Sequence, residues 1–540
     1  MKVARETVNG LLDRFSDLKQ RRTTWEPHWQ EIRHLVRVNT SDFSFNATRG
    51  QNRHENIYDG TAPWSLEQFA AGLHSHLTNP SIRWFNLEVE GFEATSSPDI
   101  LAWTEEVSDI IYGAFADPES TFNPALHEAY MDLGAFGTAV LFQDWAVDKG
   151  KLSFRSFPLA DCYIQENHDG LVDTIFRRTL MSARQIVQKF GQNELPEQMK
   201  KDQPDKEWEV IHCVYPREDL PMLKGIKTKY EMPFGSFWFS DECKHIFSES
   251  GYNSFPYHVP RWSKLAGEIY GRSPAMTCLP DIKMINQMSK VVIKGAQKAV
   301  DPPLMVPDDG FMLPLKTAPS SLIFYQQGTE PIQPLETRAR IDIGLDMMEQ
   351  RRDHIIKSFF VDWLLQQKNR TEMTATEVMD RREEKLRMMA PMIGRLESEL
   401  LGRIISRSFE LLRSNQMIPE PPEMIMGAGL SVSYSSPAST AQMSGKSVAI
   451  QKFLEDLVPM AQVDPTVMDK INLDEFVKVM AELRDVTRRI IRPDREVAEM
   501  RQGRQEQQMM MQQAEMAEPM AGSIKSLAEA EAIQAGIGNA

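Results

Sequence analysis

The chain contains 540 residues, of which 41% are hydrophobic and 25% are charged. This is an ordinary globular composition, and the length predicts roughly three or four domains of about 150 residues each. No apolar run approaches the roughly 18 residues that a membrane-spanning helix needs, which argues against a membrane protein. The net charge of −15 argues against a protein that grips DNA tightly, because such proteins carry basic patches, but not against a conduit in which DNA slides.

Neither the cysteines nor the N-terminal stretch indicates export. The four cysteines lie far apart and form no Cys-x-x-Cys pair, so we expect free thiols in a reducing compartment: Cys162, Cys213, Cys243 and Cys278. The first residues are charged and amphipathic without an apolar core segment, so no signal peptide is expected.

The first part of the chain is predicted to be mainly helical. Apolar residues at helical spacing cover residues 4–37, and Pro27 marks a break or a fresh helix start between the two halves. The same spacing predicts further helices over residues 62–77, 100–117 and 122–136. An extended segment over Ile82 to Val89 follows the turn signal at residues 78–80.

Between about residues 137 and 262 the pattern changes to short β-type runs separated by Gly, Pro, Asp and Asn clusters. One helix is predicted near 182–191. The predicted strands cover 138–145, 152–157, 172–179, 207–215, 234–240 and 254–262. Together with the preceding helices, these runs predict an α+β fold.

Two long helices with an insert between them are predicted next. The first covers residues 273–300, although Pro280 is expected to delay its regular part to about Asp281. Residues 301–336 carry seven prolines and read as a small non-helical insert. The second helix covers residues 338–360.

A loop over residues 361–373 is predicted to lead into another long helix. Thr374 and Glu377 fit a capping box, and helical spacing continues to about Ser414, with kinks expected at Pro391 and Gly394. Residues 423–490 read as a smaller helical unit. The Met- and Gln-rich tail over 498–540 reads as a solvated helix or a disordered segment.

No catalytic constellation is apparent in the sequence. Gly445-Lys446-Ser447 resembles the end of a phosphate-binding loop, but Thr440 stands where that loop needs a glycine, so a helix start is the better interpretation. His74 and His76 are two residues apart on a helix and therefore point to different faces, which makes them poor joint metal ligands. We therefore predict no catalytic residue, no metal site and no cofactor.

Charged residues form a stripe on each of the two long helices. The basic stripe lies in the helix 273–300, and the acidic stripe in the helix 338–360, at spacings that place each set on one face. One stripe would line a channel and the other would pair with a neighbouring helix, or both are ordinary solvated faces. The basic stripe is Lys283, Lys290, Lys294 and Lys298, and the acidic one is Asp342, Asp346, Glu349 and Asp353.

Several motifs resemble those of the podovirus head-to-tail connector, or portal, family. The most specific is the stretch Phe69-Ala-Ala-Gly-Leu-His-Ser-His-Leu-Thr-Asn-Pro-Ser-Ile-Arg-Trp-Phe-Asn-Leu87. The motifs are specific when taken together and cover most of residues 15–500. The others are Trp25-Glu26-x-x-Trp29, Ile57-Tyr58-Asp59-Gly60-Thr61-Ala62, Phe157 to Tyr163, Gly267 to Ser273 and Val463 to Asp474.

This resemblance implies a portal fold with an α/β wing, long stem helices, a small clip insert and a helical crown. On this chain, the wing would be 1–272, the stem 273–300 and 338–360, the clip 301–337, the tunnel loop 361–373, the kinked wing helix 374–414, and the crown 415–497. The tail 498–540 would follow the crown.

The resemblance also implies a non-enzymatic function. The protein would form a homo-dodecamer at one capsid vertex of the virion, assembled in the host bacterial cytoplasm. Double-stranded DNA would pass through its channel, and terminase, tail or adaptor proteins, and the major capsid and scaffold proteins would be its partners. Within the tunnel loop, Lys368, Asn369 and Arg370 are the candidates for contact with DNA phosphates, against the alternative of an exposed polar loop.

Two other classes remain open on the residues alone. A terminase-type ATPase or nuclease would need a complete phosphate-binding loop and an acidic metal cluster, and neither can be identified. Another head-assembly protein, such as a scaffold or a head-completion adaptor, would be mostly helical and polar. The substantial β-containing region and the ten tryptophans disfavour that second class.

Overall fold

The computed structural model contains both helices and strands, as the predicted α+β class requires. The chain divides into two units, of residues 1–95 with 102–442 and of 96–101 with 443–540. The described residues are 2–43, 56–89, 98–201, 205–217, 232–300, 304–305, 333–334, 341–364, 388–425, 429–434 and parts of 450–509.

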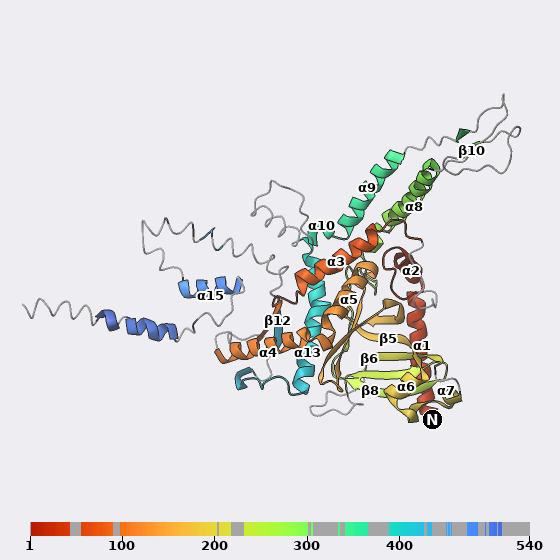
Figure 1. Ribbon diagram of the computed structural model, residues 1–540. Coiled ribbons are helices and arrows are strands. Elements are labelled where there is room, and N and C mark those ends of the chain that lie inside the picture. The colour runs from red at the N-terminus through yellow and green to blue at the C-terminus, as the bar shows by residue number, and fades with distance from the viewer. Residues whose placement is uncertain are drawn as a thin grey trace, which may run out of the picture. The chain divides into compact units, whose positions relative to one another are not determined.

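The largest sheet of the first unit is a five-stranded antiparallel meander, in which each strand pairs with the next along the chain (Figure 1). Three of its strands were predicted from the sequence, whereas β4 and β8 were not. The strands are β4 (Cys162–Glu166), β5 (Val172–Ser182), β6 (Glu207–Pro216), β7 (Phe234–Ser240) and β8 (His245–Tyr252).

Helices cover both faces of this sheet. Side chains alternate along each strand, so Ile211 and Cys213 face α1 (Lys2–Arg22), whereas Trp208 and Val210 face α6 (Ala183–Phe190) and α7 (Glu197–Lys201). Burial of both faces explains why the strands read as short apolar runs. A capping box at Ser182 begins α6, where the sequence predicted a helix.

The N-terminal helices are joined to the sheet by a buried arginine. α1 ends at Arg22 and α2 (Glu26–Leu35) begins with Pro27 in its first turn, so the predicted break is confirmed. The Arg22 guanidinium is 1% exposed and donates to the carbonyl oxygens of Leu159, Ala160 and Cys162 at 2.8–3.0 Å.

A second group of elements packs around α5 (Phe122–Phe136). It comprises α3 (Thr61–Leu77), α4 (Pro98–Ala116) and a sheet in the order β3 (Lys151–Phe157), β2 (Val140–Ala146) and β9 (Tyr257–His258). The predicted strand 254–262 is thus reduced to β9. Short 3-10 turns η2, η3, η4 and η6 lie at Pro118–Ser120, Leu159–Asp161, Gln192–Glu194 and Glu423–Ile425.

The strand β1 (Phe85–Val89) pairs with a distant strand, β12 (Leu430–Tyr434). The prediction of a purely helical unit over 423–490 is therefore wrong in its first part. Tyr434 also donates a hydrogen bond to the carbonyl oxygen of Glu397, and Trp103 donates to that of Pro419. The backbone after α13 is thus held against the first unit by pairing that local sequence does not reveal.

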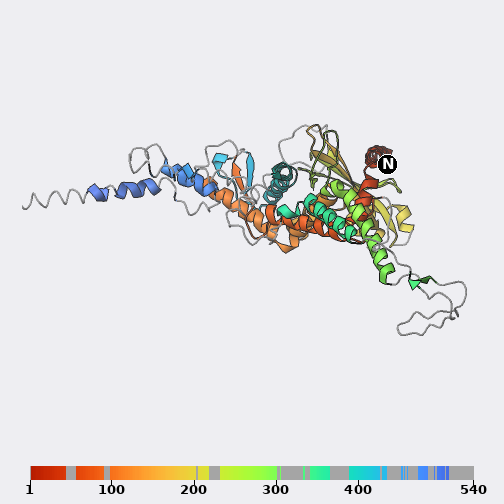
Figure 2. The same cartoon turned by 90° about the horizontal axis from the view of Figure 1, so that it is seen from above.

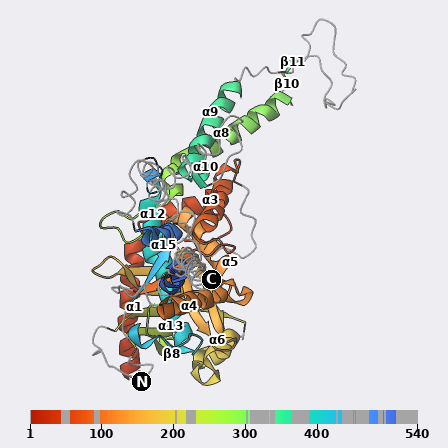
Figure 3. The same cartoon turned by 90° about the vertical axis from the view of Figure 1, so that its left-hand side faces the viewer.

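The two predicted long helices are present as α8 (Pro274–Val300) and α9 (Ile341–Ser358), which lie side by side in Figures 1 and 3. The expected delay at Pro280 is wrong, because the helix already begins at Pro274. Ser273 caps it by accepting a hydrogen bond from the backbone N–H of Met276 at 3.0 Å. Next to these helices, β10 (Leu304–Met305) and β11 (Gln333–Pro334) form a small ladder.

The segment after α9 differs from the predicted loop 361–373 at its start, because residues Val361–Leu364 form the short helix α10. The predicted helix 374–414 is described only from residue 388 on, and Thr374 lies outside the described residues. There, Met388 is helical, Met389 is not, and Pro391 lies in the first turn of α12 (Ala390–Leu396), so the helical path is interrupted next to Pro391, where a kink was expected. The irregular turn is η5, a π-helix at Glu397–Leu401, which continues into α13 (Gly402–Ser414).

The second unit is described in part. Its main helix is α15 (Leu473–Leu483), and the guanidinium of Arg501 forms two 2.7 Å hydrogen bonds with the carboxylate of Asp474. Helical residues are also present between 496 and 509, within the predicted tail, whereas residues 511–540 lie outside the described part of the chain.

Candidate functional site: the helices α8 and α9

An apolar seam joins α8 to α9. On α8, Ile282 and Ile285 are buried, and Met348 and Ile355 of α9, with Phe359 directly after it, are at most 4% exposed. Leu345 of α9, by contrast, is 50% exposed.

The helices approach closely farther along the seam, where Val292 faces Gly344. A Cβ atom at Gly344 would lie 3.5 Å from the Val292 side chain, which is ordinary van der Waals contact. Figure 2 shows α8, α9 and α3 from above as neighbouring helices.

Asp281 links the two helices by charge. Its carboxylate oxygens lie 2.8 Å from Arg351 and 2.6 Å from the ring nitrogen Nδ1 of His354. Burial would raise the pKa of Asp281, but the hydrogen bonds from His354 and Arg351 outweigh it and hold the pKa below its usual value. At this seam, the carboxylate of Asp281 on α8 therefore pairs with Arg351 and His354 on α9.

A loop before α3 packs against the base of both helices. Asp59 accepts two hydrogen bonds from Arg352 of α9, at 2.8 and 3.1 Å. Asn286 of α8 accepts from the backbone N–H of Tyr58 at 2.7 Å and donates to the carbonyl oxygen of Asn56 at 2.9 Å. These contacts give a local structural reason for the Ile57-to-Ala62 motif.

The structure divides the predicted basic stripe into two parts. Lys283 pairs with Glu31 of α2 at 2.5 Å, and the Lys290 ammonium lies 5.1 Å from the centre of the Tyr58 ring. Both residues therefore make contacts within the chain. Lys294 and Lys298 are exposed, and the structure gives neither of them an ion pair among the described residues.

The predicted acidic stripe faces solvent along its described length. Asp346, Glu349 and Asp353 are exposed, and none forms an ion pair with another described residue. The backbone of Asp342 belongs to α9, but its side chain lies outside the described residues. The predicted loop residues Lys368, Asn369 and Arg370 also lie outside them.

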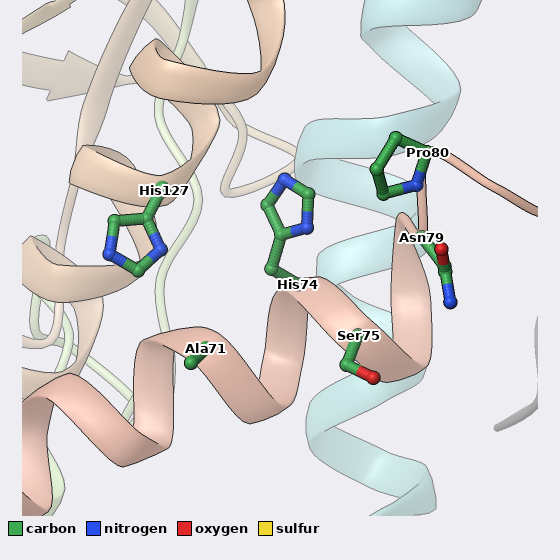
Figure 4. Close-up of a pocket in the computed structure, with 6 residues that line it drawn as sticks. All are labelled: Ala71, His74, Ser75, Asn79, Pro80 and His127. Carbon is green, nitrogen blue, oxygen red and sulfur yellow. The ribbon is translucent and has the colours of Figure 1, made fainter.

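A small pocket opens between α3 and α5 (Figure 4). It has a volume of about 360 Å³ and is lined by Ala71, His74, Ser75, Asn79, Pro80 and His127. Burial lowers the pKa of both histidines, so both rings are neutral at pH 7. The ring centres are 6.4 Å apart, and the described residues contain no group of three or more side chains that could hold a metal ion.

His74 and His76 point to different faces of α3, as their spacing predicted. His74 lines the pocket, whereas His76 is buried and bonds to the carbonyl oxygen of Leu364 in α10. No helix among the described residues is both long and apolar enough to cross a bilayer.

Comparison with known proteins gives the family. Residues 8–491 match the family described as bacteriophage head to tail connecting protein. The chain belongs to this family. A probable portal protein of Bordetella phage BPP-1 is 30% identical over 521 residues, which cover 93% of this chain and 92% of that protein. A portal protein of Salmonella phage epsilon15 is 28% identical over 544 residues, covering 96% and 95%.

The protein is therefore a head–tail connector of the portal type and a virion component, which assembles with other capsid and tail components. The motif over 69–87 now has a structural explanation. Phe69 and Trp84 are buried core residues, the Asn79 side chain accepts from the backbone N–H of Ser81, and Thr78 bonds to Tyr130.

Sequence reasoning missed the residues that hold the site together. Asp281 is one example, because its partners Arg351 and His354 are 70 and 73 residues away. Arg351 and His354 are three apart on one helix, which is the single local signal for their common role. The pairing of Asp59 with Arg352 spans 293 residues and has no such signal.

Proposed function

We propose that this connector forms a homo-dodecameric ring at one capsid vertex and is the conduit for double-stranded DNA during packaging and ejection. Membership of the head-to-tail connecting family supports this proposal, as do two relatives named as portal proteins. The observation that carries the channel assignment is the row of exposed carboxylates on α9, because a negatively charged wall repels phosphate and prevents DNA from adhering.

In this ring, Asp342, Asp346, Glu349 and Asp353 line the channel, and Lys294 and Lys298 of α8 face the neighbouring subunit. The exposed Lys294 and Lys298 have no described partner within their own chain, unlike Lys283 and Lys290. Ring closure would also bury exposed apolar side chains of the two helices. These are Met284, Val291, Ile293, Leu345 and Met347.

We assign the regions of the ring as the resemblance to portal proteins implies. Residues 1–272 with 374–414 form the wing, α8 and α9 the stem, and 301–337 the clip. Residues 415–497 contain the crown, and because β12 pairs with β1, we place the start of the crown proper after Tyr434. The tunnel loop continues from α10 to residue 373.

Lys368, Asn369 and Arg370 are the proposed DNA contacts in that loop. Two basic residues per subunit, repeated around a ring, give a thin positive belt within a negative channel. Terminase would dock during packaging, and tail or adaptor proteins afterwards. The connector itself would be non-enzymatic and need no cofactor, with assembly in the host cytoplasm alongside the major capsid and scaffold proteins.

Electron microscopy of the purified full-length protein, with its mass measured in parallel, tests the ring. Rings with a central opening and a dodecameric mass support the proposal. A monomer or dimer at high concentration and physiological salt, both alone and with its capsid partners, would contradict it and favour a scaffold or adaptor role.

The loop assignment has its own test in a DNA-packaging assay. Lys368→Glu combined with Arg370→Glu should reduce DNA retention in heads whose rings assemble normally. Normal packaging and retention by the double variant would remove these residues from the proposed contact.

A further inference from the structure

We propose that Gly72 and His76 are positioning residues, which hold α10 against α3 and so fix the point from which the tunnel loop leaves the stem. This inference rests on the proposed function only where the loop is said to contact DNA. The packing of α10 on α3 itself is a property of the described residues. Figures 1 and 3 show α10 at the lower end of α9, beside α3.

The first contact requires glycine. A Cβ atom at Gly72 would lie 2.6 Å from Cβ and 3.0 Å from Cδ1 of Leu364, closer than real Cβ atoms approach one another. Leu364 is 5% exposed. Because the clash involves the Cβ atom of Leu364, rotation of its side chain cannot relieve it, and any larger residue at position 72 must move the backbone of α10.

The second contact requires a hydrogen-bond donor one helical turn later. His76 lies four residues after Gly72, on the same face of α3. Its Nε2 atom donates to the carbonyl oxygen of Leu364 at 2.8 Å. α10 is described as far as Leu364, and the hydrogen bond from His76 holds the backbone at that residue. Leu364 is thus held through its side chain and its backbone.

The other end of α10 is held by aromatic packing. Phe360 adopts φ = 57°, a left-handed conformation that costs free energy in a non-glycine residue. Its ring packs against Trp262 with centres 5.8 Å apart, and the preceding Phe359 is fully buried with its ring centre 6.4 Å from that of Phe69. This packing holds the turn between α9 and α10.

The backbone is therefore held at Phe360 and at Leu364, four residues before the proposed DNA contact Lys368. If Leu364 shifts, we expect the contact of Lys368 and Arg370 with DNA to change. This gives Gly72 and His76 a role that differs from the general packing of α3. It also gives a reason for the spacing of Gly72 and His76 within the 69–87 motif.

Amide hydrogen exchange in the assembled ring tests the positioning directly, in a peptide spanning residues 359–366. Gly72→Ala and His76→Ala should each exchange there roughly tenfold faster than the unaltered protein, because a contact to Leu364 is lost. His76→Gln places a donor close to that of Nε2 and should restore slow exchange. Gly113→Ala is the matched helical control, since a Cβ atom there meets nothing within 4 Å.

DNA retention in assembled heads is the second measurement. Faster exchange with reduced retention in Gly72→Ala and His76→Ala, but not in His76→Gln or Gly113→Ala, supports the inference. Unchanged exchange in both variants overturns it, whatever retention does. Faster exchange with normal DNA retention would support the role of Gly72 and His76 in holding α10. It would contradict the proposed contact of the tunnel loop with DNA. If Gly72→Ala fails to form rings, the comparison of His76→Ala with His76→Gln decides.

Discussion

Two glycines meet where α5 ends and α8 begins. Gly137 has φ = +75°, and its backbone N–H caps α5 by bonding to the carbonyl oxygen of Leu133. A Cβ atom at Gly137 would lie 2.5 Å from the carbonyl oxygen of Gly271, and one at Gly271 would overlap the carbonyl oxygen of Gly137. The backbones therefore cross at a distance that only two glycines allow.

Gly271→Ala should consequently lower the free energy of unfolding by about 1–3 kcal/mol, the usual range for overpacking. Denaturant-induced unfolding of the purified protein measures this. Gly10→Ala is the control, since a Cβ atom on that helical glycine meets nothing within 4 Å and the change should be neutral or slightly stabilising. Equal stability of the two variants would show that the backbones at Gly137 and Gly271 can move apart without loss of stability.

Two buried histidines make the fold sensitive to acid. His212 bonds to the hydroxyl groups of Tyr257 and Ser236, and His258 bonds to Gln143. Burial holds the pKa of each far below 6.5, and nearby cations lower it further: Arg177 and Lys189 at His212, Arg407 and Arg403 at His258. Both rings stay neutral in the folded protein under conditions that protonate them in the unfolded chain.

Stability from these histidines is therefore complete above pH 6.5 and is lost as the pH falls below that value, because only the unfolded chain then takes up the protons. Each should contribute a slope of up to about 1.4 kcal/mol per pH unit. Unfolding measured between pH 7.5 and pH 5 checks this, and His258→Gln should show a shallower decline. If the free energy of unfolding of His258→Gln falls as steeply with pH as that of the unaltered protein, His258 does not contribute to the loss of stability in acid.

At the level of whole elements, a π-helical turn connects α12 and α13 to the rest of the first unit. The extra residue in η5 directs Glu399 at Arg261, which is 1% exposed. Glu399 accepts from Nε and Nη2 of Arg261 at 3.1 and 2.8 Å, and Arg261 also donates to the carbonyl oxygen of Gly170. A buried ion pair thus determines where α13 lies.

Glu399→Gln should lower the free energy of unfolding by about 3 kcal/mol, because Arg261 would keep its buried charge with Glu166 as its main remaining anionic partner. Chemical denaturation measures the loss. Glu268→Gln breaks an exposed pair with Arg272 and should cost less than about 1 kcal/mol. A similar cost for both variants would mean that the buried pair does not anchor α13.

At the scale of the whole molecule, the net charge and the positions of the charged side chains would govern how a ring of this protein interacts with DNA. Repeating the exposed row Asp346, Glu349 and Asp353 around a ring would multiply its field within a narrow channel, where low-dielectric walls focus it. Lys294 and Lys298 of α8 would face the neighbouring subunit and not the channel. An acidic protein can in this way surround DNA without binding it tightly.

Neutralising the row with Asp346→Asn, Glu349→Gln and Asp353→Asn should therefore slow DNA passage, most of all at low ionic strength, where screening is weakest. Packaging rates at about 50 mM and 200 mM salt measure this. The control makes the same charge change at exposed wing carboxylates, as Asp13→Asn, Asp148→Asn and Glu242→Gln. Equal rates for the two triple variants would place the row outside the channel.

Local sequence determined the elements whose pattern is repeated within a few turns. The helical spacing of α1, α3, α5, α8 and α9 and the short β-type runs of β5, β6 and β7 were readable without any partner. The motif over residues 69–87 could be recognised as specific, but the residues that it contacts could not. β4 and β8 were missed because their few apolar residues are flanked by polar ones, and pairing with neighbours supplies the rest of their stability.

The sequence by itself thus determined the α+β class, the helix–insert–helix order and the two charged stripes, because periodicity and charge spacing are properties of neighbouring residues. Only the tertiary structure decided what those features contact. The π-turn that directs Glu399 at Arg261, the pairing of β1 with β12 and the contact of His76 with Leu364 join residues 138 or more positions apart. Burial at such contacts depends on the whole chain having folded, and no local pattern encodes it.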